Sequence, residues 1–244
     1  MKFSGSVAVV TGGGQGIGAA VARALAKEGA SVIVAARTTD RIDAVAAEIK
    51  GKAVRCDVTD PAGVRDLAQA AGQVDILVNN AGVAYSAPLL KTTFDDWNRV
   101  LAVNATGTFL CTKAFVAGMV ERNRGAIVNV ASVAGLDGAR YIAAYAAAKH
   151  AVIGFTRSVA AELEGTGVTC NAVCPGFVDT EMTKDSVARV VQKTGKSPDA
   201  ALAAMLASSS QQRLITPDEV ARAVLALCDF TGKRPNGTAV TIAD

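Results

Sequence analysis

Aromatic residues are scarce in this sequence, and the usual signs of metal binding, secretion and nucleic-acid binding are missing. Phe, Trp and Tyr make up 5% of the 244 residues, and no long basic run or aromatic-rich basic patch is present. The five cysteines show neither a paired zinc spacing nor a C-x-x-C redox motif. We find no signal peptide and no uninterrupted apolar run of membrane-spanning length. We therefore expect a cytoplasmic protein with reduced core thiols, no metal ion, and no nucleic-acid or membrane partner.

Apolar residues are plentiful, because half of the chain is hydrophobic and only 19% is charged. This composition excludes a disordered chain and provides material for a large core of Ala, Val, Leu and Ile. The length suits one large α/β domain or two small ones, and no Gly/Ser/Pro linker divides the sequence. We expect a single domain over residues 1–244.

Short β-branched runs alternate with helical patterns along nearly the whole chain. The expected strands are Val7–Thr11, Ser31–Ala36, Lys52–Cys56, Val74–Asn79, Ala126–Ala131, Val168–Val173 and Thr238–Ile242. The expected helices are Gly16–Gly29, Thr38–Lys50, Pro61–Ala71, Phe94–Glu121, Ala143–Glu164 and Thr216–Asp229. Nearly continuous apolar strands that alternate with helices are typical of a parallel sheet covered on both faces. The sequence therefore predicts a Rossmann-type, doubly wound α/β fold of about seven strands.

One segment departs from this alternation. Residues 181–214 have helix-like apolar spacing but no strand pattern. An extra helical segment between the sixth and seventh strands would lie over the carboxyl ends of the strands, where such sheets bind ligands. We expect a substrate lid at about 181–214.

The first strand leads into a glycine-rich turn and then into an Ala-rich helix. The turn contains Gly12, Gln15, Gly16, Ile17 and Gly18, spaced G-x-x-x-G-x-G. Glycines allow backbone N–H groups to approach a pyrophosphate, which the helix N-terminus also attracts. Many loops carry glycine for backbone freedom alone, but the position between the first strand and first helix favours dinucleotide binding.

Tyr145 and Lys149 are four residues apart in a predicted helix and so share one of its faces. A free phenol has a pKa of about 10 and is a poor base at neutral pH. A nearby ammonium would favour the phenolate, and Tyr145 could then exchange a proton with a substrate oxygen. By itself such a pair is common, and it usually marks an exposed helix face.

Together these motifs resemble the short-chain dehydrogenase/reductase family, from Val7 to about Ile242. Ser132 lies thirteen residues before Tyr145, and Asn104 lies in an apolar helix where Asn and a following glycine are locally unfavourable. The resemblance implies a catalytic tetrad of Asn104, Ser132, Tyr145 and Lys149. In it Ser132 orients the substrate oxygen, and Asn104 holds a water near Lys149.

The resemblance also implies a set of cofactor-binding residues. Asp57 and Val58 would meet the adenine, although Asp57 could equally organise its own turn. The Asn79–Gly82 stretch matches the family's NNAG motif, with a structural role expected to be the larger one. Tyr145 and Lys149 would contact the nicotinamide end. The remaining expected contacts are Asn80, Ala81, Gly82, Pro175, Gly176, Val178 and Thr180.

The end of the second strand indicates which dinucleotide is bound. Ala36 stands where a carboxylate would bind the ribose 2′-hydroxyl of NAD, and Arg37 follows it. An arginine there accommodates the 2′-phosphate of NADP. Gln15 stands where many NADP-using relatives have a basic residue. The sequence favours NADP(H) and leaves NAD(H) possible.

Several functions stay open at this point. We favour a reductase of a ketone or a 3-oxoacyl thioester, with an NAD-dependent secondary alcohol or hydroxyacyl dehydrogenase as the alternative, and a nucleotide-binding regulator without turnover further behind. The resemblance implies a homo-oligomer, commonly a tetramer. Lys184, Arg189, Lys193 and Lys196 could meet the phosphates of a thioester carrier, but a solvated helix face is the preferred interpretation. The candidates for a mostly apolar substrate pocket are Leu136, Arg140, Tyr141, Phe177, Met182, Met205 and Leu206.

Overall fold

Parallel strands form one sheet in the computed structural model, which describes residues 1–232 and 234–243. These residues give a seven-stranded sheet in the order β3-β2-β1-β4-β5-β6-β7. The strands are β1 (Val7–Thr11), β2 (Ser31–Ala36), β3 (Lys52–Arg55), β4 (Ile76–Asn79), β5 (Gly125–Val130), β6 (Val168–Pro175) and β7 (Ala239–Ile242). The predicted doubly wound sheet is confirmed. Its strand order reverses between β1 and β4, so the switch point that binds ligands in such sheets lies there.

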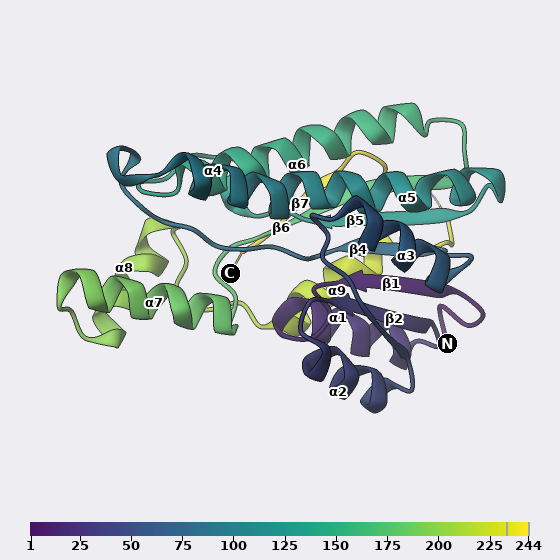
Figure 1. Cartoon of the computed structure of the whole chain (residues 1–244), viewed down its shortest axis with the longest axis horizontal. Coiled ribbons are helices and arrows are strands. Elements are labelled where there is room, and N and C mark those ends of the chain that lie inside the picture. The colour runs from purple at the N-terminus through teal and green to yellow at the C-terminus, as the bar shows by residue number, and fades with distance from the viewer. Residues whose placement is uncertain (233, 244) are drawn as a thin grey trace.

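Helices cover both faces of the sheet (Figure 1). The helices α1 (Gly16–Lys27), α2 (Thr39–Ile49) and α9 (Pro217–Leu227) form one layer. The helices α3 (Pro61–Ala71), α4 (Phe94–Leu101), α5 (Gly107–Glu121) and α6 (Ala143–Glu162) form the other. Side chains alternate between the two layers along each strand: Val10 belongs to the core cluster with α1, and Val9 to the cluster with α5. This explains why the strands are apolar on both faces.

The predicted ends of the elements agree with the structure to within two residues, and those of β1, β2 and α3 agree at both ends. The strand β4 begins at Ile76 rather than Val74, and the Asp75 carboxylate before it accepts a hydrogen bond from the Val7 N–H. Pro175 extends β6 because its position at the strand end requires no amide donor, and it pairs with Ile242. The predicted start of α9 is confirmed, with Thr216 and Glu219 forming a capping box around Pro217.

The predicted helix over Phe94–Glu121 is helical along its whole length, but it contains a π-helical segment around Asn104. The structure has α4, a π-helical segment η2 (Ala102–Thr106) and α5 in succession. The Asn104 side chain donates to the Val100 carbonyl four residues earlier, at 2.9 Å, and so competes with the regular backbone ladder. Widened turns of this kind often mark functional positions.

This interrupted run also corrects the expectation about apolar stretches. Among the described residues, Phe94–Glu121 is long and apolar enough to cross a membrane, by length and composition alone. Core helices of soluble proteins pass the same test, so the finding is weak evidence for a membrane span. In this structure Cys111, Phe115 and Met119 of the run pack into the core beside the sheet residues Val9 and Leu77. The run therefore covers one face of the sheet.

The segment 181–214 is helical, as predicted. It contains α7 (Glu181–Thr194) and α8 (Pro198–Ser208). Figure 1 shows both helices at the end of the sheet opposite the N-terminus, below the long connection that precedes α4. This is the carboxyl end of the parallel strands. The two helices are therefore placed where they could cover a bound ligand.

Candidate active site

The glycine turn after β1 is held by close backbone approaches. Gly12 and Gly16 adopt positive φ angles of 64° and 52°, which glycine tolerates best. A Cβ atom on Gly18 would lie 2.3 Å from the Gly12 carbonyl oxygen and 2.4 Å from Asn80 Nδ2. A side chain at position 18 would therefore push the first turn of α1 away from β1. The turn keeps its shape only with glycine there.

The N-terminus of α1 is suited to an anion. Gln15 caps the helix in an extended conformation, and within the described residues neither a side-chain cap nor an acidic residue occupies the first turn of α1. The first backbone N–H groups of a helix lack intrahelical partners and carry the positive end of its dipole. A pyrophosphate would satisfy both features.

A cavity of about 220 Å³ opens at this turn, at the switch point of the sheet. Eleven of the predicted cofactor residues line it: Gly12, Gln15, Gly16, Ile17, Arg37, Asp57, Val58, Asn80, Ala81, Gly82 and Thr180. The other predicted residues lie outside its lining: Gly18, Tyr145, Lys149, Pro175, Gly176 and Val178. The structure thus brings together the residues predicted for the adenosine and pyrophosphate end.

Asp57 and Asn80 both have structural partners in addition to their place at the cavity. Asp57 Oδ1 accepts hydrogen bonds from the Thr59 N–H at 2.9 Å and from Thr59 Oγ1 at 2.8 Å. The first of these bonds is the main reason that the pKa of Asp57 is lowered. Asn80 Nδ2 donates to the carbonyls of Thr11 and Gly12, at 3.0 and 3.1 Å. Each residue therefore organises its own turn, as the alternative interpretation expected, and lines the cavity as well.

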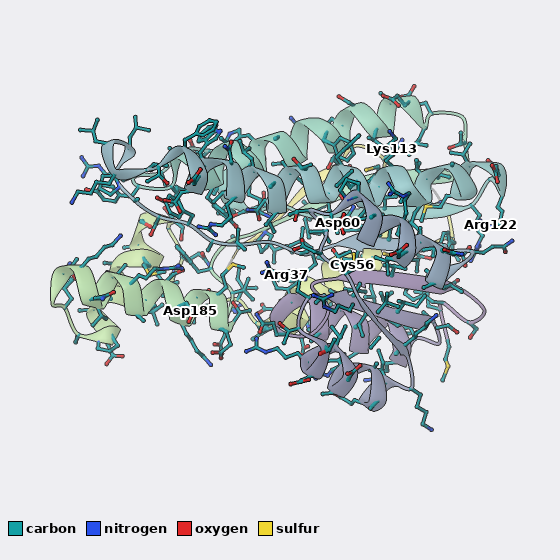
Figure 2. All side chains as sticks on the ribbon, in the orientation of Figure 1. Arg37, Cys56, Asp60, Lys113, Arg122 and Asp185 are labelled. Carbon is teal, nitrogen blue, oxygen red and sulfur yellow. The ribbon has the colours of Figure 1, made fainter. Side chains whose placement is uncertain are left out.

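The end of β2 carries positive charge. Arg37 is exposed and lies 4.0 Å from Asp57 Oδ2, at the long limit of an ion pair. Figure 2 shows Arg37 and Cys56 near the centre of the molecule, and both line the cavity. Arg41, one helical turn further along, lines the cavity too, and its Cβ would lie 2.9 Å from a Cβ built on Gly14. Arg37 and Arg41 therefore line the cavity together with Ala36, which stands at the position where a carboxylate would bind the ribose 2′-hydroxyl.

Asn104 is buried in η2, and protein groups bind both atoms of its side-chain amide. Nδ2 donates to the carbonyls of Val83 and Val100, at 3.0 and 2.9 Å, and Oδ1 accepts from the Val83 N–H at 3.2 Å. The side chain therefore holds the β4–α4 connection as a neighbouring strand would. A Cβ built on Gly82 would lie 2.8 Å from Asn104 Oδ1 and 3.7 Å from Lys149 Nζ. Asn104 and Lys149 thus converge beside Gly82, at the inner side of the cavity.

Ser132, Tyr145 and Lys149 meet where β5 ends and α6 begins. Lys149 Nζ donates to the Val130 carbonyl at 2.8 Å and lies 5.8 Å from the centroid of the Tyr145 ring. Ser132 Oγ accepts from the Ala134 N–H at 3.2 Å. Ser132 is buried and Tyr145 half-buried, so the three side chains form a polar group at the edge of the apolar core. The four residues of the predicted tetrad therefore lie near one another, on η2, just after β5 and on α6.

Burial shifts the pKa values of this group. It raises the pKa of Tyr145, an effect that the hydrogen bond from Ser132 partly offsets. It also lowers the pKa of Lys149 to about 8. The direction for Tyr145 is opposite to the one expected from a neighbouring ammonium, because desolvation of the phenolate outweighs the hydrogen bond from Ser132. Without a cofactor, Tyr145 therefore holds its proton at neutral pH.

Comparison with known proteins identifies the family. A family model described as short chain dehydrogenase matches residues 6–190. The chain belongs to the short-chain dehydrogenase family. It is an oxidoreductase that acts on CH–OH or C=O groups, and the cofactor of its family is NAD(P).

Named relatives of this short-chain dehydrogenase include both reductases and dehydrogenases. The 3-oxoacyl-[acyl-carrier-protein] reductase of Synechocystis sp. is 44% identical over 193 residues, 75% of this chain and 78% of the relative. The 2-(S)-hydroxypropyl-CoM dehydrogenase 3 of Xanthobacter autotrophicus is 38% identical over an alignment of 252 residues, 99% of this chain and 96% of the relative. A crystal structure of an actinorhodin polyketide ketoreductase variant with NADPH has a TM-score of 0.92 and 34% identity, covering 100% of this chain and 97% of that one.

The turn after β6 approaches the glycine turn of this short-chain dehydrogenase from the opposite side. A Cβ built on Gly16 would lie 3.1 Å from Thr180 Cγ2, so the two turns face each other across the cavity. Val178 is buried and forms a β-bridge with Ile215. Its side chain is therefore structural, and only Thr180 of the turn's predicted contacts lines the cavity.

Of the predicted substrate residues, only Met182 lines the described cavity. Tyr141 is 59% exposed, and its φ of 70° is a strained conformation for an aromatic residue. Its carbonyl accepts from the Ala87 N–H at 2.8 Å, while Lys193 of α7 donates to the neighbouring Ser86 carbonyl at 3.4 Å. These contacts bring the β4–α4 connection, the loop before α6 and the helix α7 together. Leu136 and Met182 are also partly exposed, at 42% and 39%.

Several cavity residues were missed in the sequence. They are Gly14, Ala36, Thr38, Arg41, Cys56, Val83, Val103, Glu181 and Met182, the last of which was assigned only to the substrate. Arg41 had a usable signal, since it follows Arg37 by four residues on the predicted second helix. Val83 and Val103 had none, because their position depends on how Asn104 holds the β4–α4 connection. The single histidine, His150, contacts the Ala146 carbonyl of its own helix at 2.9 Å and plays no part in this site.

Proposed function

We propose that the protein is an NADP(H)-dependent reductase of ketones, with 3-oxoacyl thioesters as the favoured substrate class. The observation that carries the proposal is the polar group of Ser132, Tyr145 and Lys149 beside the dinucleotide cavity. In this group the half-buried Tyr145 phenol lies next to the buried Lys149 ammonium. The 3-oxoacyl reductase among the relatives supports the substrate class.

The glycine turn supports binding of the dinucleotide. Its close approaches at Gly12 and Gly18, together with the uncapped N-terminus of α1, suit a pyrophosphate. When bound, NADPH supplies a hydride to the carbonyl carbon. The chain's own residues hold the substrate oxygen and provide the proton.

Tyr145 is the proposed general acid. Burial raises the pKa of its hydroxyl, so the proton stays on Oη until a stronger base forms beside it. Reduction of a carbonyl creates such a base at the substrate oxygen. Ser132 Oγ is placed to hydrogen bond that oxygen, and Lys149, whose pKa is lowered to about 8, is still mostly protonated at neutral pH. Its charge favours proton release from Tyr145.

Arg37 and Arg41 support NADP over NAD. Both line the cavity beside Ala36, and a 2′-phosphate there would accept charge-assisted hydrogen bonds. The NADPH in the ketoreductase crystal structure agrees with this choice. The second candidate function is an NAD-dependent secondary alcohol or hydroxyacyl dehydrogenase. It is favoured by Gln15 in the glycine turn and by the dehydrogenase that aligns with 99% of the chain.

We also propose a homotetramer with one catalytic domain per chain, over residues 1–244, in the cytoplasm. The helix α5 has apolar residues on its outer side as well as toward the core, and Phe109 and Val120 are partly exposed there. Phe109, 42% exposed, packs edge-to-face against Phe155 of α6 on the outside of this layer. A large exposed apolar face supports association of copies. The five buried cysteines support a reducing compartment.

The test is a screen of NADPH and NADH oxidation against ketones, diketones and 3-oxoacyl thioesters, in parallel with oxidation of secondary alcohols. We expect NADPH-dependent reduction of at least one 3-oxoacyl thioester, with a markedly lower KM for NADPH than for NADH. Turnover confined to NAD⁺ and secondary alcohols would instead support the second candidate. Dinucleotide binding without turnover of any substrate class would overturn both.

A further inference from the structure

Gln211 lies in the connection between α8 and α9, outside the residues assigned to the site, yet its side chain is only 6% exposed. Its Oε1 accepts from the Phe177 N–H at 2.7 Å and from Ser209 Oγ at 3.0 Å. Its Nε2 donates to the carbonyls of Phe177 and Arg213, both at 3.3 Å. Both donor hydrogens of the amide are therefore engaged, and its oxygen accepts from Phe177 and shares the single Ser209 hydroxyl hydrogen with the Leu206 carbonyl.

The bonds to Phe177 fix the turn after β6. Gln211 binds both backbone groups of that residue, so the amide acts like an additional strand residue beside the turn. Ile215 N–H donates to the same Phe177 carbonyl at 2.9 Å, and the Asp179 N–H donates to the Ile215 carbonyl at 2.8 Å. The short segment 177–179 is therefore held on one side by Gln211 and Ile215.

Gly176 is glycine because of Gln211. A Cβ atom on Gly176 would lie 2.2 Å from Gln211 Oε1 and 2.6 Å from Gln211 Cδ. The backbone of Gly176 is not among the positive-φ positions, so alanine would fit its conformation. The amide itself is held by its four bonds and cannot move aside without losing them. Glycine at position 176 thus leaves room for the side chain of Gln211, which comes from a distant segment.

Gln211 also connects this turn to α8. Its own N–H donates to the carbonyl of Leu206, in the last turn of α8, at 3.0 Å. Ser210, just before it, has a φ of 55°, a conformation that costs free energy for a residue with a side chain. The backbone between α8 and α9 is therefore strained at Ser210, the residue that directs Gln211 into the interior.

The geometry points to Gln211 as a positioning residue that joins α8 to the turn at Phe177 and fixes the part of that turn that faces the cofactor and the substrate. This inference rests on the proposed function, in which Phe177 lines the substrate pocket and Thr180 faces the dinucleotide. Thr180 follows Phe177 by three residues and stands opposite Gly16. Loss of the Gln211 hydrogen bonds would loosen both contacts while leaving the tetrad intact.

The first test compares Gln211→Ala with Gln69→Ala, which changes the same residue type at an exposed position of α3, outside the expected lid. For Gln211→Ala we expect kcat/KM to fall about tenfold or more, because a buried amide's partners lose their bonds. We also expect the Phe177 amide hydrogen to exchange faster. Gln69→Ala should change neither. Faster exchange with unaltered kcat/KM would overturn the positioning role and leave the proposed function standing, whereas inactive wild-type protein would overturn the function itself.

A second variant, Gln211→Glu, adds a readout that a purely structural role would not move. The ionised carboxylate would face the carbonyls of Phe177 and Arg213 and could donate to neither, while the protonated acid could donate to one. We expect the ratio of variant to wild-type kcat/KM to rise as pH falls from about 8 to about 6. A ratio independent of pH would overturn the proposed donor role.

The third test uses Gly176→Ala. We expect this variant to lose at least about tenfold in kcat/KM, because the new methyl group displaces the amide. The double variant Gly176→Ala/Gln211→Ala removes the atoms that clash, so its loss should be clearly smaller than the product of the two single losses. If the double variant's loss in kcat/KM equalled the product of the two single losses, the two positions would act independently and the inference would be overturned. Wild-type activity of Gly176→Ala would overturn it as well.

Discussion

The two ends of the site are built from different kinds of contact. At the glycine turn the closest approaches are between backbone atoms, such as the Gly12 carbonyl and Gly18, and the Asn80 side chain donates to the same carbonyl. Under α7 and α8 the contacts join side chains to backbone groups far away in the sequence. Lys193 reaches the carbonyl of Ser86 across 107 positions, and Gln211 reaches Phe177 across 34.

This difference separates two aspects of function. The glycine turn Gly12–Gly18, called the cradle below, recognises a ligand class through its backbone. Any chain with the same glycines offers the same N–H groups to a pyrophosphate. Exposed side chains such as Tyr141 and Met182, which we propose as substrate contacts, can change without disturbing the fold. Under this proposal the cofactor class is fixed at one end of the site, and the substrate is selected at the other. The polar group at Tyr145 lies between them.

The largest effect is expected at that junction. Tyr145→Phe removes the hydroxyl and keeps the ring, so kcat should fall by about 10²- to 10⁴-fold, the usual contribution of a general acid. The affinity for NADPH, measured by fluorescence titration, should stay within a few-fold of wild type. That result would show that the cradle works independently of the chemistry. A variant that retains wild-type kcat would remove Tyr145 from the mechanism.

The next effect isolates the cradle itself. Gly18→Ala would place a methyl group 2.3 Å from the Gly12 carbonyl oxygen, and overpacking of this kind costs about 1–3 kcal/mol or more. We expect thermal stability and NADPH affinity to fall together. Gly154→Ala is the matched control, since a Cβ there meets nothing within 4 Å, and in the interior of α6 it should stabilise by up to about 1 kcal/mol. Equal behaviour of the two variants would contradict the cradle.

A smaller effect should distinguish recognition of the cofactor's 2′-phosphate from binding of its pyrophosphate at the glycine turn. Arg37→Asp is expected to raise the KM for NADPH about tenfold, through loss of one charge-assisted bond and addition of a repulsive charge. Arg41→Ala should raise it less, because it adds no repulsion. Steady-state kinetics with NADH serves as the control, since NADH lacks the 2′-phosphate and its KM should not rise. An equal increase in both KM values would point to a loss of fold rather than of phosphate binding.

The sheet and the cradle could be predicted from the sequence because their signals are local. Val7–Thr11 predicts a buried parallel strand by its own composition, and the glycines follow it directly. Asn104 also gave a local signal, an unfavourable polar residue in an apolar helix, and the structure has a π-helical segment there. Strand ends were less predictable, because Pro175 belongs to β6 only through its pairing with Ile242.

The contacts at the lid end could not be predicted, since they depend on tertiary structure. The sequence marks Gln211 as an ordinary polar residue in a connection, and its burial follows only from the course of the chain around Phe177. The direction of the Tyr145 pKa shift was missed for a related reason. Spacing in a helix shows that Lys149 is near, but not how strongly the surrounding residues exclude water from the phenol.

The smallest effect tests how far water is excluded from Lys149 when no cofactor is bound. The pKa of Lys149 is lowered from 10.5 to about 8 in the folded chain, so between these values the unfolded chain binds more protons than the folded one. Stability must then rise with pH over this range, by less than about 1.4 kcal/mol per pH unit. Tyr145, with its raised pKa, opposes this only above about pH 10. Urea unfolding of wild type and Lys149→Met at pH values from about 8 to 10 should therefore give diverging stabilities. If the free energies of unfolding of the two proteins changed in parallel with pH, water would reach Lys149. Its pKa would then depend little on burial between the two ends of the site.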